Sequence, residues 1–130
     1  MFALDTNTLI YFFKGVGRVK ARLLATPPAE IAVPSVVLYE LEVGIVLSAQ
    51  PTKRRSLLDE FLSVVAVWSF DEAAAKIAAG ITRDLSTQGI KIGPMDTLIA
   101  GTALAHKATL VTNNTGEFNR VRGLSVEDWS

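Results

Sequence analysis

The chain has 130 residues and a formal net charge of zero, with 13 lysine and arginine residues against 13 aspartate and glutamate residues. Hydrophobic residues make up 49% of it, which excludes a disordered chain and predicts one globular domain over residues 1–130. The absence of cysteine excludes disulfides and thiolate metal sites, and the single histidine, His106, excludes zinc sites that need two imidazoles.

Short β-branched runs alternate with stretches of helical length, which is typical of an α/β domain with a mainly parallel sheet. Strands are predicted over residues 2–4, 31–33, 64–67 and 109–112. Helices are predicted over residues 6–13, 18–25, 35–47, 52–62, 71–87 and 96–106, with Ser35, Thr52, Asp71 and Asp96 at their starts. The segment 120–130 has no clear pattern.

The N-terminus has no basic region and no long apolar stretch, so it is unlike a signal peptide. The longest apolar runs are too short to span a bilayer. We therefore expect a cytoplasmic chain without a membrane contact.

Three acids stand in apolar or turn-forming surroundings, where a carboxylate is costly: Asp5, Glu40 and Asp96. Asp5 follows the first predicted strand, at the end where open α/β sheets bind ligands, and Thr112 and Asn114 follow another strand. No lysine or arginine lies within three residues of the three acids. If these carboxylates converge they need a cation, and ligation by oxygen alone favours Mg²⁺ or Mn²⁺.

Simpler interpretations of the same residues remain open. Asp5 and Asp96 could each serve only as a helix N-cap. Glu42 has apolar helical neighbours just as Glu40 does, so spacing does not choose between them. His106 lies about 15 Å along a helix from Asp96 and is interpreted as a helix C-terminal residue.

Because the net charge is zero, a polyanion would have to bind a local cluster of cations. One cluster, favoured as an RNA contact, consists of Lys14, Arg18, Lys20 and Arg22. A second, interpreted as a solvated face, is Lys53–Arg55. Arg120 and Arg122 form a third basic group close to the last predicted strand.

Four segments, in this order, resemble the motifs of PIN-domain ribonucleases, and of the VapC toxins of VapBC toxin–antitoxin pairs in particular. They are Leu4–Asn7, Pro34–Gly44, Ile92–Ala100 and Leu110–Phe118. The resemblance covers nearly the whole chain in motif order, spacing and length. It implies a PIN-like α/β/α sandwich with a mainly parallel central sheet.

The resemblance also implies an activity and a set of site residues. Asp5, Glu40 and Asp96 would hold Mg²⁺ or Mn²⁺ and activate a water molecule against an RNA phosphodiester, leaving a 5′-phosphate and a 3′-hydroxyl. Thr6 and Thr112 would orient the carboxylates or a bound water molecule. Glu42 would be left with a structural or supporting role.

Asn114 departs from the pattern, because many PIN domains carry a fourth acid at this position. Its amide can accept a hydrogen bond or ligate through its carbonyl oxygen, but it supplies no charge. Glu117 is the only nearby acid that could substitute.

The same resemblance implies that the chain is the toxin of a type II toxin–antitoxin pair. Its substrate would be tRNA or ribosomal RNA, its inhibitor a VapB-type antitoxin and its assembly a homodimer, with DNA bound only through the antitoxin. Surplus apolar residues of the first helices would line the antitoxin groove: Tyr11, Phe12, Phe13, Leu38, Leu41 and Leu47.

Two rival hypotheses use the same residues. A haloacid-dehalogenase-like phosphatase would employ Asp5, but that chemistry needs a second aspartate where Asn7 stands. A non-catalytic PIN-like or receiver-like module would bind a partner through the apolar groove. The receiver version expects an adjacent acidic pair, which Asp5 lacks.

Overall fold

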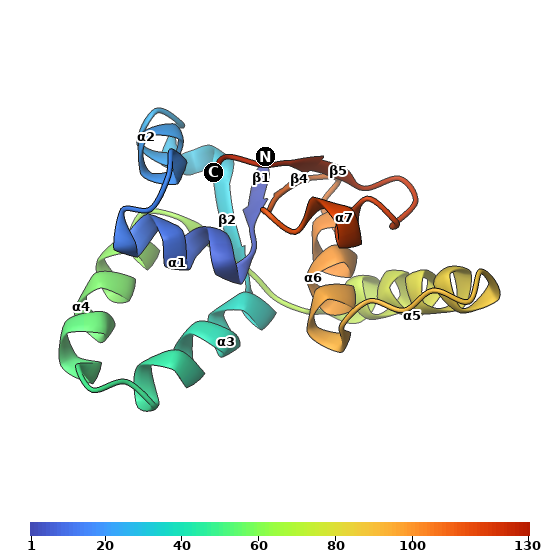
Figure 1. Cartoon of the computed structure of the whole chain (residues 1–130), viewed down its shortest axis with the longest axis horizontal. Helices are drawn as coiled ribbons and strands as arrows, with labels where there is room; N and C mark the ends of the chain where they lie inside the picture. The colour runs from blue at the N-terminus through green and yellow to red at the C-terminus, as the bar shows by residue number, and fades with distance from the viewer.

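A five-stranded sheet, parallel throughout and ordered β3–β2–β1–β4–β5, forms the centre of the computed structural model, which describes residues 1–130 (Figure 1). The strands are β1 (Phe2–Leu4), β2 (Ile31–Pro34), β3 (Ala66–Trp68), β4 (Thr109–Val111) and β5 (Ser125–Glu127). The helices are α1 (Thr6–Lys14), α2 (Val19–Leu24), α3 (Ser35–Val46), α4 (Pro51–Leu62), α5 (Glu72–Thr87), α6 (Pro94–Ala105) and α7 (Thr115–Phe118), with a 3₁₀ turn, η1, at Pro28–Glu30.

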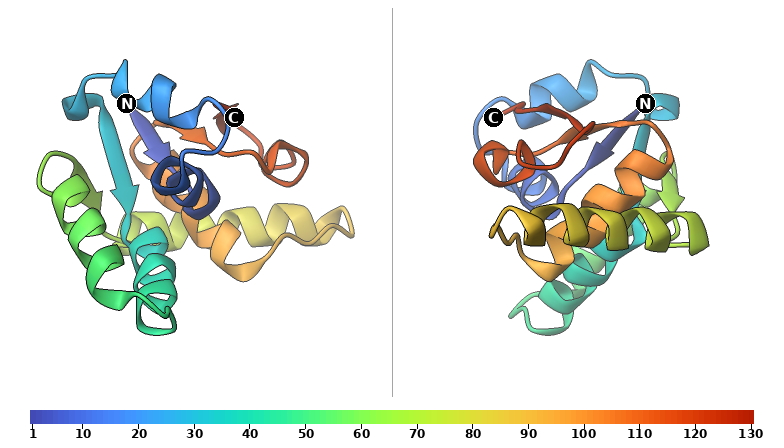
Figure 2. Two further views of the ribbon diagram at one scale, coloured as in Figure 1. Left: turned by 60° about the vertical axis from the view of Figure 1, so that its left-hand side comes forward. Right: turned by 90° about the vertical axis from the view of Figure 1, so that its right-hand side faces the viewer.

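The strand order creates a switch point between β1 and β4. From β1 the chain proceeds outward through β2 to β3, and α5 and α6 then carry it back across the sheet to β4. Because such crossovers are right-handed, the two directions place α1 and α2 on one face and α5 and α6 on the other (Figure 2). The predicted α/β/α sandwich is confirmed, and ligands of such sheets bind at this switch point.

The central strands are buried on both faces, which explains why they are apolar runs rather than alternating ones. Ala3 and Leu4 of β1 and Leu110 of β4 are fully buried. The edge strand β3 is different, because its Ala66 and Val67 are exposed. It pairs with β2 over Ala66–Trp68, two residues later than its predicted start.

Three of the four predicted helix starts are wrong, because a proline stands at the start of each of these helices. Pro51 is the first residue of α4, so Thr52 lies inside the helix rather than at its cap. Pro34 precedes α3 as its N-cap residue. The hydroxyl of Ser35 instead accepts a hydrogen bond from the backbone N–H of Phe70 at 3.0 Å, which ties α3 to the segment after β3.

The start of α6 also differs from prediction. Pro94 opens this helix, and Asp96 is its third residue, in the first turn but not at the cap. Asp71 does cap α5 as predicted, accepting a hydrogen bond from the N–H of Ala74 at 3.0 Å.

The C-terminal segment is ordered by partners far away in the sequence. Strand β5 pairs with β4, and the ring of Trp129 packs edge-on against Phe2 with centroids 5.1 Å apart. Trp129 is 3% exposed, so the last residues of the chain complete the core. No local pattern in this segment predicts β5.

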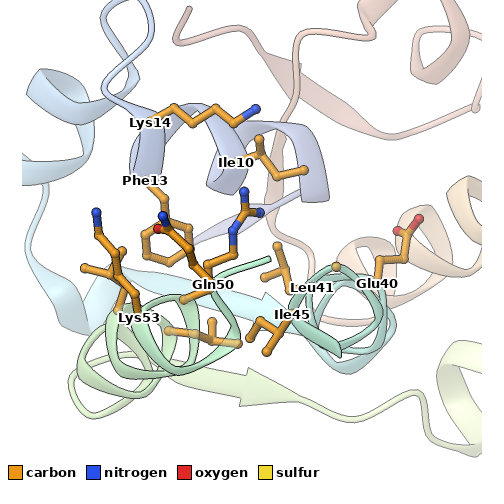
Figure 3. Close-up of a pocket in the computed structure, with 12 residues that line it drawn as sticks. Ile10, Phe13, Lys14, Glu40, Leu41, Ile45, Gln50 and Lys53 are labelled. Atoms are coloured by element: carbon orange, nitrogen blue, oxygen red, sulfur yellow. The ribbon is translucent and has the colours of Figure 1, made fainter. Parts of the chain in front are cut away.

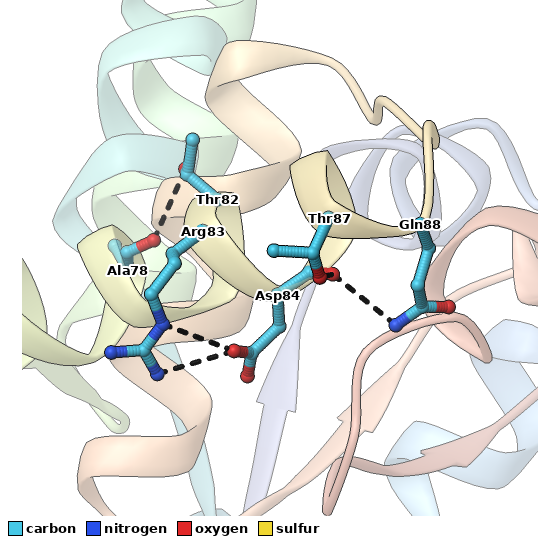
Figure 4. A network of polar contacts seen from close by, with 6 residues as sticks. All are labelled: Ala78, Thr82, Arg83, Asp84, Thr87 and Gln88. Carbon is cyan, nitrogen blue, oxygen red and sulfur yellow. Dashed lines mark hydrogen bonds and ion pairs between the residues drawn. The ribbon is translucent and has the colours of Figure 1, made fainter.

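Helices α5 and α6 pack very closely through small residues. A Cβ atom on Gly101 would lie 2.8 Å from the Cβ of Ala78 and 3.0 Å from the carbonyl oxygen of Ala74. The outer face of α5 is polar, with Arg83 bound to Asp84 and with Thr87 and Gln88 donating to the Asp84 carbonyl (Figure 4). This network only completes the end of the helix.

His106 is the C-terminal cap residue of α6, as predicted. Its ring stacks on Trp68 with centroids 3.9 Å apart and an interplanar angle of 4°. Every helix is too short or too polar to cross a lipid bilayer.

We predict that Gly101→Ala lowers the free energy of unfolding by about 1–3 kcal/mol, because the added methyl group must push α5 away from α6. Gly44→Ala is the matched control. Gly44 lies in helix α3 with open space around its Cβ position, so alanine there should stabilise the protein by about 0.5–1 kcal/mol. Urea denaturation measures both, and equal stability of the two variants would contradict the packing argument.

Candidate active site

Asp5 stands at the switch point, between the end of β1 and the start of α1. Its Oδ1 accepts a hydrogen bond from the N–H of Thr8 at 2.9 Å, and its Oδ2 accepts one from the hydroxyl of Thr112. Asp5 is 5% exposed, and burial raises its pKa, although the donors Thr112 and Thr8 counteract this. Asp5 is therefore a helix N-cap and also a buried carboxylate beside the loop after β4.

Thr8 ties the first turn of α1 to the end of β4 and is a residue that the sequence reasoning missed. Its hydroxyl donates to the carbonyl oxygen of Val111 at 3.0 Å, and the N–H of Asp5 donates to the same carbonyl at 3.1 Å. The available signal was its position three residues after an N-cap aspartate, where a backbone N–H turns toward the cap.

Glu40 and Glu42 point to different partners, which answers the question that spacing left open. The hydroxyl of Thr6 donates to Glu40 Oε1 at 2.6 Å, and this places Glu40 beside Asp5. Glu42 faces α4, where both its oxygens accept hydrogen bonds from Arg55, and these bonds lower the pKa of Glu42.

Asp96 faces the same site from the first turn of α6. Burial is the main reason that its pKa rises to about 6, and the negative charges of Glu117, Asp5 and Glu40 raise it further. The four acids thus come from four different elements and repel one another. None of them forms an ion pair with a lysine or arginine.

Glu117, on α7, is held by donors on both sides of its carboxylate. Asn114 Nδ2 donates to one oxygen at 2.7 Å and the N–H of Gly93 donates to the other at 2.7 Å. These bonds lower its pKa, with a smaller contribution from the charge of Arg120. Asn114 thus orients an acid instead of replacing one, and its own N–H binds the hydroxyl of Thr112 at 2.9 Å.

Gly93 leaves room where the two acids meet. A Cβ atom there would lie 3.7 Å from Asp96 Oδ2 and 3.9 Å from Glu117 Oε1. In the side-chain arrangement of the structure, no three acids are grouped as a metal-holding set. What the structure shows is a cluster of carboxylates that forms no ion pair with a lysine or arginine.

A groove of about 240 Å³ opens beside Glu40, between α1, α3 and α4 (Figure 3). Its floor is apolar, and Glu40 stands at one end while Lys53 stands at the other, with Lys14 projecting from α1 (Figure 3). The lining residues are Ile10, Phe13, Lys14, Glu40, Leu41, Gly44, Ile45, Gln50, Lys53, Arg54, Leu57 and Leu58.

The apolar residues that were predicted to line an antitoxin groove do not all lie in this groove. Phe13 and Leu41 line this groove, whereas Phe12 packs into the core against Phe61 with ring centroids 5.4 Å apart. Leu47 is 80% exposed and lies outside the groove.

The residues of the predicted basic clusters also lie in different surroundings. Lys14, Lys53 and Arg54 line the groove and form no ion pair. Arg22 pairs with Glu127 at 3.6 Å instead. The second cluster is therefore not only a solvated face.

The sequence model of the PIN domain matches residues 2–124. The chain belongs to the PIN-domain family. Among the relatives of this PIN domain, the tRNA(fMet)-specific endonuclease VapC of Shigella flexneri is 37% identical over 129 residues, covering 99% of the chain and 98% of that relative. Ribonuclease VapC2 of Rickettsia felis is 36% identical, with the same coverage of both chains.

Solved structures agree with the sequence relatives. VapBC2 of Rickettsia felis, bound to a DNA fragment from its promoter, superposes on this PIN domain with a TM-score of 0.92, 34% identity and coverage of 99% of the chain and 98% of the other. DNA-bound VapBC of Salmonella typhimurium also gives a TM-score of 0.92, at 33% identity and the same coverage. The resemblance to VapC-type PIN-domain ribonucleases is confirmed, and the phosphatase and receiver hypotheses gain no support.

The raised pKa of Asp96 predicts a stability that depends on pH. The folded state binds the Asp96 proton more tightly than the unfolded state, whose carboxyl has a pKa near 3.8. The stability of the metal-free PIN domain should therefore fall as the pH rises from about 4 to about 6, and the loss should be complete above that window. Thermal midpoints measured in chelator across this range give the curve.

Asp96→Asn should raise the thermal midpoint at pH 7.5 and flatten the curve between pH 4 and 6, with a residual slope from Asp5. Asp84→Asn, which removes an exposed carboxylate bound only to Arg83, is the matched control and should leave the slope unchanged. Identical curves for both variants would show that folding does not raise the pKa of Asp96.

Proposed function

We propose that this VapC-type PIN domain is a metal-dependent endoribonuclease and the toxin of a toxin–antitoxin pair. One observation carries the proposal: Asp5, Glu40, Asp96 and Glu117 converge at the switch point of the sheet, and none of them forms an ion pair with a lysine or arginine. The raised pKa values of Asp5 and Asp96 are a cost to stability at neutral pH, which is typical of a functional site.

The residues of this cluster fit a divalent metal ion. All the available donor atoms are carboxylate, amide or hydroxyl oxygens, which suit Mg²⁺ or Mn²⁺ and exclude a preference for softer metals. Asp5, Glu40 and Asp96 would hold the ion, with Glu117 close beside Asp96. A bound ion would offset the repulsion among these acids and favour ionisation of water next to a phosphodiester.

Hydrogen bonds from neighbouring residues of the chain fix the orientation of these carboxylates. Thr112 and Thr8 fix both oxygens of Asp5, and Thr6 fixes one oxygen of Glu40, so neither carboxylate has to be ordered when substrate arrives. Asn114 and the N–H of Gly93 do the same for Glu117. Attack of water on phosphorus with departure of the 3′-oxygen would leave a 5′-phosphate and a 3′-hydroxyl.

RNA is the proposed substrate, with tRNA or ribosomal RNA as the structured targets, and the name of one relative favours tRNA. The Shigella flexneri relative is a tRNA(fMet)-specific endonuclease and the Rickettsia felis relative is a ribonuclease. A balanced net charge requires local cations for the RNA backbone, and Lys14, Lys53 and Arg54 line the groove that ends at Glu40 and form no ion pair.

A VapB-type antitoxin is the proposed partner, bound in the groove between α1, α3 and α4. The apolar floor suits hydrophobic side chains, and the rim of Lys14, Lys53 and Arg54 suits acidic residues. Occupation of a groove that ends at Glu40 would block the site. DNA would then be bound through the antitoxin and not by this chain, in a complex built on a toxin homodimer.

The test of the activity is cleavage of structured RNA by partner-free protein with Mg²⁺, with Mn²⁺ and with chelator. Asp5→Asn and Glu40→Gln should each lower the rate at least about 100-fold, since each removes a charge that the site holds in place. Glu42→Gln is the matched control two residues away on the same helix and should retain the rate, although losing the bond to Arg55 costs some stability.

A thermal shift with metal alone completes this test. Mg²⁺ should raise the thermal midpoint of the wild type and of Glu42→Gln, but not that of Asp5→Asn. Cleavage that persists in chelator, or equal loss in the Glu40 and Glu42 variants, would overturn the assigned site. Absence of cleavage in the wild type would favour the non-catalytic module.

Binding of the antitoxin should depend on the basic rim of the groove. Reversing charge with Lys53→Glu and Arg54→Glu should weaken binding to a VapB-type antitoxin at least about tenfold, with a steeper effect at low salt. Lys107→Glu, an exposed unpaired lysine outside the groove, is the control and should bind normally. Isothermal titration measures all three, and unchanged affinity in the rim variants would place the partner elsewhere.

A further inference from the structure

Asn113 and Tyr11 form a pair that the acid cluster does not use. Asn113 Nδ2 donates a hydrogen bond to the Tyr11 hydroxyl at 2.9 Å, across 102 positions of sequence. Both side chains are half-buried, so the pair faces solvent on one side. From the sequence, Tyr11 is expected on an apolar surface, and Asn113 has no expected role.

The pair borders the candidate active site directly. Asn113 stands between Thr112, which donates to Asp5, and Asn114, which donates to Glu117. Tyr11 follows Asp5 by six residues, which is about 9 Å along the axis of α1. A phosphate bound at the carboxylates would therefore bring the base of an adjoining nucleotide to this pair.

The chemistry of the pair suits a nucleobase and not a phosphate. Neither residue carries a charge, so neither adds attraction for the RNA backbone. With one amide N–H committed to Tyr11, Asn113 keeps a carbonyl oxygen and a second N–H, and the Tyr11 hydroxyl keeps its own hydrogen to donate. Unpaired RNA bases are recognised in this way, by amide and hydroxyl groups on their edges and by stacking on aromatic rings.

We propose that Tyr11 and Asn113 recognise an unpaired nucleobase next to the scissile phosphate and so determine the cleavage preference of the enzyme. Tyr11 positions the amide of Asn113, and the fixed amide selects one base edge over another. This inference rests on the proposed ribonuclease activity, and it adds a source of sequence preference to it.

The experiment maps cleavage of a random single-stranded RNA pool by sequencing the new ends. Tyr11→Phe removes the hydroxyl and keeps the ring, and Asn113→Ala removes the amide. Each should lower the preference for the favoured nucleotide at one position beside the cut about fivefold or more, with less than about threefold change in the total rate. The matched controls, Tyr39→Phe on the exposed face of α3 and Asn119→Ala after α7, should keep the wild-type preference.

A second measurement separates this inference from the proposed activity. In the Asp96→Asn background, fluorescence anisotropy compares binding of short homopolymers of the four nucleotides. The parent should bind one of them about fivefold or more tightly over the others, and adding Tyr11→Phe or Asn113→Ala should remove that difference. This result supports base recognition even where the wild type cleaves nothing.

A lower thermal midpoint with an unchanged cleavage preference and unchanged base discrimination would overturn the inference. It would show that the bond between Tyr11 and Asn113 only ties α1 to the loop after β4.

Discussion

Mutual repulsion of carboxylates at the carboxyl ends of the central strands is the constraint on which the rest of this structure depends. Asp5, Glu40 and Glu117 are held in place by hydroxyl and amide donors, and neither they nor Asp96 forms an ion pair. Donors of this kind orient a carboxylate without neutralising it. The fold therefore leaves negative potential where a metal ion and a phosphodiester are proposed to meet, and the rest of the sheet supplies the rigidity that keeps it there.

Local pattern was enough to find much of this site. Asp5 was visible because a strand, an acid and a helix follow one another at the N-terminus, and Thr112 because hydroxyl and amide residues follow another strand. Tertiary structure was needed for the rest. Glu40 and Glu42 have equally apolar neighbours along the helix, and only Thr6 from α1 and Arg55 from α4 distinguish them. Asn114 could not be seen to orient Glu117, because that bond depends on the geometry of a four-residue helix.

The fold was predictable to a similar degree and for the same reason. Buried central strands and amphipathic helices carry strong signals, so four strands and six helices were expected close to where they lie. Strand β5 was missed because its order comes from β4 and from the contact of Trp129 with Phe2, both remote in sequence. Proline at the first helical position displaced the expected start of α4, since it fixes the backbone more strongly than a capping hydroxyl does.

The contact of Gly101 with Ala78 fixes how closely the helix that carries Asp96 approaches α5. At this point the two helices meet with no room for a side chain on Gly101, because a Cβ there would meet the Cβ of Ala78. The outer face of the α3–α4 hairpin carries a half-exposed ion pair between Glu42 and Arg55, which water and salt weaken, while Leu58 and Phe61 anchor α4 in the core. Substitutions on the exposed face of α4 should thus disturb the acids little, so this face can change what it binds while the buried carboxylates stay as they are.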